Sequence, residues 1–130
     1  MENQKKKKIL IIDDEPDVVV YLAALFMDHG FSVIAASTGR EGFEKAKLET
    51  PDLISLDITM PEETGIRTFW DLQGDSATQS IPVIVITGTP GDFNQLHSGE
   101  DLKASLAAYF EKPINREKLI KRIKEILKVN

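Results

Sequence analysis

Five polar residues of this sequence are of the types that hold a metal ion and receive a phosphoryl group. They are Asp13, Asp14, Asp57, Thr87 and Lys112, and each lies where a short apolar run ends. Carboxylates that lie close together repel one another, so their ionised forms need a cation nearby. Mg²⁺ favours carboxylate oxygens and commonly bridges protein to phosphate. If the runs before Asp13 and Asp57 are neighbouring strands, the three aspartates meet in one crevice and form a site for this ion.

The same set of residues is suited to phosphoryl transfer. A carboxylate is a competent nucleophile toward a phosphoryl group. Transfer requires that charge on the phosphoryl oxygens be shared with a metal ion, a hydroxyl and an ammonium. Thr87 supplies the hydroxyl and Lys112 supplies the ammonium. Taken singly, these residues are equally typical of helix caps, turns and surface loops, and only their joint occurrence indicates a site.

The elements that must position these residues alternate along the whole chain. Apolar runs typical of strands are followed by amphipathic patterns typical of helices, which predicts an α/β fold with a parallel sheet covered by helices on both faces. In such sheets ligands bind beyond the carboxyl ends of the strands. Strands are predicted at 9–12, 31–35, 53–56, 82–86 and 107–110, and helices at 16–29, from the Thr38 cap to Thr50, around 66–72, in part of 92–105, and after the Asn115 cap.

Length and composition limit the classes of protein to consider. The 130 residues suit a single domain, with residues 1–7 as a basic N-terminal tail, and the 42% hydrophobic and 28% charged residues suit a globular protein. The chain has no cysteine, which excludes disulfides and thiolate chemistry and fits a cytoplasmic location. Its net charge of −5 makes nucleic acid a poor partner, and the longest apolar run, Val18–Met27, is too short to span a membrane.

The motifs in their order along the chain resemble the receiver domain of two-component response regulators. The resemblance covers essentially the whole sequence and implies a doubly wound, flavodoxin-like (βα)5 sheet of strand order 2-1-3-4-5. The matching residues are Ile9–Glu15 (ILIIDDE), Asp57 with Met60-Pro61 and Gly65, Thr87-Gly88, and Tyr109 with Lys112-Pro113.

This resemblance implies a role for each residue around the metal. Asp57 would be the phosphoacceptor and, with Asp13 and Asp14, would hold Mg²⁺. Asp14 would ligate the ion directly and Asp13 largely through water, while Thr59 would offer its backbone carbonyl.

The resemblance also implies how the phosphorylated state is sensed. Thr87 and Lys112 would bind the phosphoryl oxygens, and Tyr109 would be the switch aromatic that turns inward as Thr87 moves toward the phosphate. The Lys112-Pro113 bond would be cis, an isomer accessible mainly to X-Pro bonds.

By the same resemblance the chain is expected to be a switch without external turnover, and thus not an enzyme. A sensor histidine kinase or a histidine phosphotransfer protein would donate the phosphoryl group. The face formed by the fourth helix, fifth strand and fifth helix would contact an output domain or protein. The span from Thr87 to Lys112 is a few residues longer than is usual in the family, which leaves the output less supported than the chemistry.

Three other classes of protein deserve comparison. A haloacid-dehalogenase-type phosphatase needs an acid two residues after its nucleophile, and Thr59 stands there. A flavodoxin-type cofactor binder needs a phosphate cradle after the first strand, where the acidic stretch Asp13–Asp17 would repel phosphate. The main alternative is therefore an interaction module with the receiver fold that works without phosphorylation.

Overall fold

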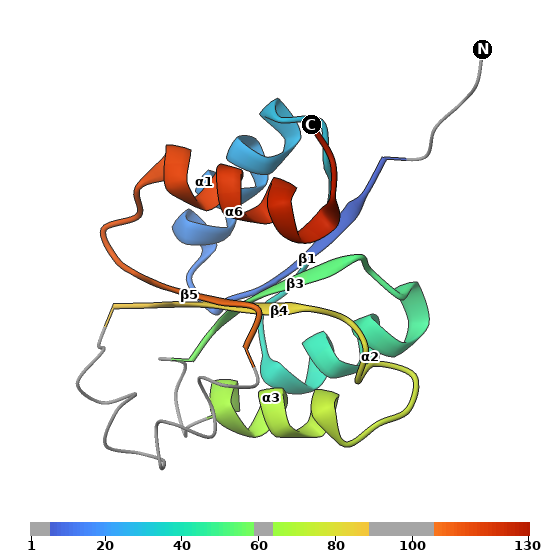
Figure 1. Cartoon of the computed structure of the whole chain (residues 1–130). Coiled ribbons are helices and arrows are strands. Elements are labelled where there is room, and N and C mark those ends of the chain that lie inside the picture. The colour runs from blue at the N-terminus through green and yellow to red at the C-terminus, as the bar shows by residue number, and fades with distance from the viewer. Residues whose placement is uncertain (1–5, 59–63, 89–105) are drawn as a thin grey trace.

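The protein is built around one parallel sheet, seen in a computed structural model that describes residues 6–58, 64–88 and 106–130 (Figure 1). Five strands run in the order β2-β1-β3-β4-β5, as predicted. Each strand begins or ends within a residue or so of the predicted position. The strands are β1 (Lys8–Ile12), β2 (Ser32–Ala36), β3 (Leu53–Asp57), β4 (Val83–Thr87) and β5 (Ala108–Glu111).

The helices lie on both faces of the sheet, which confirms the doubly wound fold. Figure 1 shows α1 and α6 on one face, and α2 and α3 on the other. The helix expected within 92–105 lies outside the described residues. Over the described ranges, no helix has the length and apolar character needed to cross a membrane. The helices are α1 (Pro16–Asp28), α2 (Gly39–Glu49), α3 (Thr64–Gln73) and α6 (Arg116–Leu127).

Two of these helices begin at side-chain caps that the sequence predicted. The Thr38 hydroxyl accepts a hydrogen bond from the Glu41 backbone N–H at 3.1 Å, and the Asn115 side chain accepts one from Lys118 N–H at 3.0 Å. Each bond satisfies a donor that the first helical turn leaves unpaired. Helix α1 begins differently, because its N-cap residue Glu15 makes no capping hydrogen bond with its side chain.

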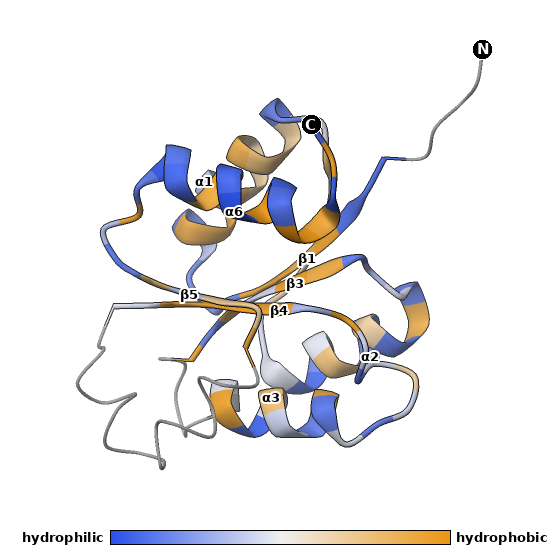
Figure 2. Cartoon of the chain, viewed as in Figure 1, coloured by the Kyte–Doolittle hydropathy of each residue, from blue (hydrophilic) through white to orange (hydrophobic). Residues whose placement is uncertain are grey.

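The apolar core is divided by the sheet into two layers. On β1, Leu10 and Ile12 point into the layer shared with α2 and α3, whereas Ile9 and Ile11 point into the layer shared with α1 and α6. All four side chains are fully buried. Figure 2 shows the resulting hydrophobic strands between helices that carry both hydrophilic and hydrophobic residues. Burial on both faces holds the central strands rigidly, and their carboxyl ends with them.

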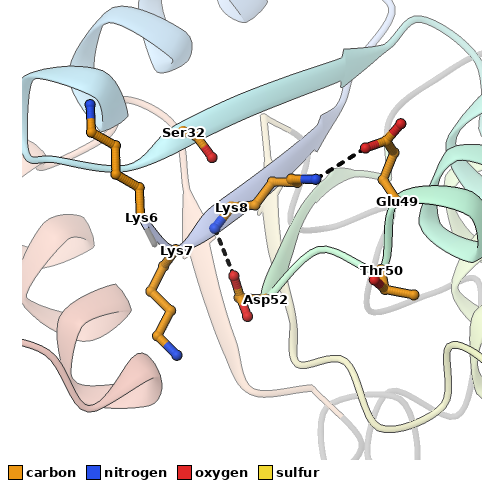
Figure 3. A pocket seen from close by; sticks show the side chains of 7 residues that line it. All are labelled: Lys6, Lys7, Lys8, Ser32, Glu49, Thr50 and Asp52. Carbon is orange, nitrogen blue, oxygen red and sulfur yellow. Dashed lines mark hydrogen bonds and ion pairs between the residues drawn. The ribbon is translucent and has the colours of Figure 1, made fainter. Parts of the chain in front are cut away.

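The amino end of the sheet is held together by a group of polar contacts around Lys8 (Figure 3). The Lys8 backbone N–H donates to the Asp52 carboxylate at 2.7 Å, and the Lys8 ammonium lies 3.0 Å from Glu49 Oε1. Ser32 N–H donates to the carbonyl of Lys7 at 2.9 Å. These contacts line a hollow of about 540 Å³ and join the starts of β1 and β2 to the loop after α2.

The edge strand β2 is protected by the helix that follows it. The Lys45 ammonium of α2 donates to the carbonyl of Ala35 at 2.6 Å. Glu41 holds this ammonium at 3.1 Å and accepts a hydrogen bond from the Ser37 N–H at 2.8 Å. Charged side chains placed over an edge strand discourage pairing with a strand of another molecule.

The close packing of α2 on β1 depends on Gly42. A Cβ atom at this position would lie 2.5 Å from Cδ1 and 2.7 Å from Cγ1 of Ile12, a side chain that is fully buried in the core. We therefore predict that Gly42→Ala lowers the free energy of unfolding by about 1–2 kcal/mol, even though alanine is the better helix former. Urea denaturation measures this change.

Gly74→Ala is the matched control, because the nearest atom to its Cβ would be the Trp70 carbonyl oxygen at 3.4 Å. Its effect is expected to stay within about 0.5 kcal/mol. Equal stability of the two variants would show that α2 does not pack on β1 as described.

Candidate functional site

The carboxyl ends of β1 and β3 bring three aspartates together. The two strands are parallel neighbours with Ile12 opposite Leu56, so Asp13 and Asp57 lie side by side. One carboxylate oxygen from each of Asp13, Asp14 and Asp57 lies within 4.8 Å of the others. The side chains of Asp13 and Asp57 are each 3% exposed, whereas Asp14 is open to solvent. The topology has thus gathered the three predicted metal-site aspartates.

Asp13 is held firmly by its neighbours. Its backbone N–H donates to the carbonyl of Ala36 at 3.1 Å, and its carboxylate accepts a hydrogen bond from the Glu15 N–H at 2.9 Å. Burial raises the pKa of Asp13 from 3.8 to about 6, and the negative charge of Asp57 adds to the rise. The Glu15 N–H and the positive charge of Lys112 oppose it without cancelling it.

This donor set fits a small hard dication. Oxygen ligands from carboxylates are those that Mg²⁺ prefers, and the exposed Asp14 leaves a path for an ion that keeps several waters. A bound cation would also favour the ionised form of Asp13, whose pKa is raised chiefly by burial and further by the charge of Asp57. Thr59, whose carbonyl was predicted as a further ligand, lies outside the described residues.

Thr87 and Lys112 close the other side of the crevice. Thr87 is the last residue of β4 and is completely buried. The Lys112 backbone N–H donates to the Thr87 carbonyl at 2.8 Å, which fixes the two residues relative to each other. The peptide bond from Lys112 to Pro113 is cis, the isomer that the resemblance implied. A hydroxyl and an ammonium therefore lie at the ends of the strands next to the aspartates.

The Lys112 ammonium has an ion-pair partner that sequence reasoning missed. It lies 3.7 Å from Oε1 of Glu15, the N-cap residue of α1. In the sequence Glu15 was only the last residue of the motif Ile9–Glu15. No sequence signal pointed to the pair, because it depends on how the loops after β1 and β5 face each other.

Gly65 brings α3 against the end of β3. A Cβ atom here would clash with the Asp57 carbonyl oxygen and with the Cα of Ile58. Only glycine lets the first turn of α3 lie directly on the backbone that carries the aspartate. Gly65 is one of the residues on which the family resemblance rests, and this close approach gives it a structural role.

Tyr109 lies on β5, the edge strand of the sheet that ends near the site. It is partly buried and packs against the core layer that faces α2 and α3. Burial raises its pKa above 10.0, and the nearby Glu111 raises it further. Tyr109 is thus neither fully buried nor fully exposed, and it lies two residues before the end of β5.

A largely apolar hollow of about 390 Å³ adjoins the site between α1 and the segment after β5. Tyr21, which is 42% exposed, stands on the α1 side, and Ile114 stands opposite. The sequence analysis did not identify this hollow. Its lining residues are Asp17, Val18, Tyr21, Lys112, Pro113 and Ile114.

Fold and site together define the class of protein. A sequence model described as the response regulator receiver domain matches residues 9–124. The chain therefore belongs to the receiver domains of two-component signalling. Its strand order and the clustered aspartates at the ends of β1 and β3 agree with this assignment.

Individual relatives are identical to this chain at about one residue in three. It is 32% identical to Protein PilH of Pseudomonas aeruginosa, over 92% of this chain and 97% of PilH. It is 34% identical to the alkaline phosphatase synthesis transcriptional regulatory protein PhoP of Bacillus subtilis, over 94% of this chain but only 49% of PhoP. The chain thus spans about half the length of PhoP.

Solved structures show the same arrangement. A CheY-like response regulator receiver domain protein from Methanospirillum hungatei superposes with a TM-score of 0.83 at 28% identity, covering 95% of each chain. The chemotaxis response regulator CheY4 of Vibrio cholerae gives a TM-score of 0.80 at 25% identity, over 94% of this chain and 99% of CheY4.

The raised pKa of Asp13 leads to a prediction for the metal-free protein. Because the folded state binds this proton more tightly than the unfolded chain does, lowering the pH from 7 to 5 stabilises the fold through this group. Relative to Asp13→Asn, the wild type should gain about 1 kcal/mol of unfolding free energy over this range. Urea denaturation of both proteins at each pH, with chelator present, measures the difference. Parallel pH profiles would contradict it.

Proposed function

We propose that this chain is a phosphorylation switch in which Asp57 accepts a phosphoryl group from a phosphohistidine. The observation that carries the proposal is the cluster of the buried Asp13 and Asp57 with the exposed Asp14, with Thr87 and Lys112 at the neighbouring strand ends. The phosphohistidine would belong to a sensor histidine kinase or a histidine phosphotransfer protein in the cytoplasm.

The three aspartates would hold Mg²⁺, with Asp14 as a direct ligand, Asp13 acting largely through water, and the Thr59 carbonyl completing the protein's share. When bound, this ion supplies positive charge to the carboxylates and to the phosphoryl oxygens. Asp13 is anchored by the Ala36 carbonyl and the Glu15 N–H, so its position does not depend on the ion.

Transfer would proceed by attack of an Asp57 carboxylate oxygen on phosphorus. The new P–O bond forms as the P–N bond to the donor's imidazole breaks, and the ring nitrogen keeps the electron pair. The Thr87 hydroxyl and the Lys112 ammonium would donate hydrogen bonds to the phosphoryl oxygens as charge develops there. Hydrolysis of the acyl phosphate by water would restore Asp57. The chain would thus catalyse its own modification and have no external substrate.

The phosphorylated state would be favoured by contacts that the other state lacks. Hydrogen bonds from Thr87 and Lys112 to the phosphoryl group are of the charge-assisted type, which is stronger than the neutral one. Shifting a two-state equilibrium from 1:99 to 99:1 requires about 5.5 kcal/mol. Movement of Thr87 toward the phosphate would vacate space next to β5, and Tyr109 would turn inward to fill it.

The output partner would bind beside Tyr109. This residue lines a hollow of about 480 Å³ over β5 and α6, together with Lys118 and Arg122 among others. The Tyr109 ring packs on the other face of the sheet, toward α2 and α3, so a turn of this ring would change the exposed edge of β5 next to the hollow. The remaining part of the proposed face, the fourth helix, lies outside the described residues.

The central prediction concerns Asp57. Incubation with Mg²⁺ and acetyl phosphate should add one phosphoryl group to the wild type, because the donor set activates this carboxylate. Asp57→Asn should add none, since an amide is a poor nucleophile, and a chelator should block the reaction. Intact-mass spectrometry measures the modification.

Mg²⁺ binding should be measured on the same sample by calorimetry, because a wild type that binds the ion without modification would still permit transfer from a protein donor. Absence of both modification and metal binding would refute the switch. The favoured account would then be an interaction module that works without phosphorylation.

The hollow between α1 and the segment after β5 is the proposed docking site of the phosphodonor. It borders Lys112 and is largely apolar, and Tyr21 offers an exposed ring there. Tyr21→Ala should therefore slow transfer from a phosphorylated histidine phosphotransfer protein about tenfold. It should leave the rate with acetyl phosphate unchanged, because this small donor needs no docking surface.

Trp70→Ala is the matched control, since Trp70 is equally exposed but lies on α3. Both rates come from mass spectrometry of quenched samples. Equal slowing of the two donors in Tyr21→Ala would contradict a docking role.

A further inference from the structure

The ion pair between Glu15 and Lys112 crosses the crevice of the candidate site. Glu15 stands at the start of α1, and Lys112 directly follows β5. The ammonium that would bind the phosphoryl group therefore lies 3.7 Å from a carboxylate that is outside the aspartate cluster.

Glu15 is held in place by its own backbone. Its carbonyl accepts hydrogen bonds from the N–H groups of Val18 and Val19, each at 3.1 Å, and its N–H donates to the Asp13 carboxylate at 2.9 Å. Its side chain takes no part in capping the helix. The carboxylate is therefore directed by a rigid helix start while remaining available to Lys112.

The exposure of the two partners makes the pair easy to break. The Glu15 side chain is 62% exposed and that of Lys112 is 24% exposed. Water can replace the ammonium at Glu15 at little cost, so such a pair contributes little net free energy. A buried carboxylate in the same place would hold the lysine far more tightly, because separating a buried pair leaves an uncompensated charge.

We propose that Glu15 is a positioning residue that holds the Lys112 ammonium in the unphosphorylated state and releases it when a phosphoryl group arrives on Asp57. This inference rests on the proposed function. Glu15 and the phosphoryl oxygens compete for one ammonium, so the carboxylate shifts the equilibrium toward the unphosphorylated form. It thereby limits how readily the active-like form is populated without a phosphoryl group.

The test uses BeF₃⁻, an analogue of the phosphoryl group that binds without a covalent donor. In saturating Mg²⁺, Glu15→Gln should bind BeF₃⁻ about two- to fivefold more tightly than the wild type, because Lys112 no longer has a competing carboxylate. Glu15→Asp, which keeps the charge but is one methylene shorter, should lie between them. Fluorine NMR titration measures the three dissociation constants.

Asp17→Asn is the matched control for the loss of one negative charge. Asp17 lies in the same first turn of α1 and beside the same hollow as Lys112, but within the described part of the chain it makes no ion pair. Its BeF₃⁻ affinity should stay close to that of the wild type. In metal-free protein the ¹⁵Nζ resonance of Lys112 should move in Glu15→Gln and not in Asp17→Asn.

The outcomes separate this inference from the proposed function. Equal affinities in Glu15→Gln and Asp17→Asn, or weaker binding in Glu15→Gln, would overturn the role of Glu15 while leaving the phosphorylation switch intact. A wild type that binds neither Mg²⁺ nor BeF₃⁻ would overturn the proposed function, and this inference with it. Urea denaturation of each variant confirms that the compared proteins are folded.

Discussion

Mutual repulsion among three carboxylates is the constraint around which this molecule is organised. Asp13, Asp14 and Asp57 are brought within a few ångströms of one another by strand order, since β1 and β3 are neighbours. Burial raises the pKa of Asp13 to about 6, and the negative charge of Asp57 contributes to the rise. A sheet buried on both faces can sustain such repulsion, because its strands cannot separate without exposing the apolar core.

The same rigidity limits which parts of the molecule could move in the proposed switch. Thr87 and Asp57 are fixed by the hydrogen-bonded ladder of β3 and β4, so any adjustment to added charge falls on side chains and on the segments beyond the strands. Tyr109 lies on the last strand and Lys112 directly follows it, at the other side of the crevice from the aspartates. Under the proposed function, charge added at Asp57 would therefore act on groups that are less tightly confined than the core.

Strand positions, helix caps and the grouping of the site residues were predictable from the sequence because they follow from periodicity and chain order. The residues at which each strand begins and ends were less predictable. Phe31 is apolar and buried, yet its N–H donates to the Phe26 carbonyl in the turn after α1, and pairing begins at Ser32. The ion pair of Glu15 with Lys112 and the depth of burial of Asp13 depend on contacts between distant segments, which no local pattern encodes.

The contacts around Lys8 have a consequence for how such a domain can diverge. They lie at the amino ends of the strands, at the opposite edge of the sheet from the aspartates. The stabilising contacts around Lys8 and the aspartate cluster therefore lie at opposite ends of the strands. Substitutions of Lys8, Glu49 or Asp52 can then change the thermal stability of the fold while the aspartate cluster keeps its geometry. Evolution in a hotter or colder habitat could thus adjust the stability of the fold at these contacts without changing the aspartate cluster.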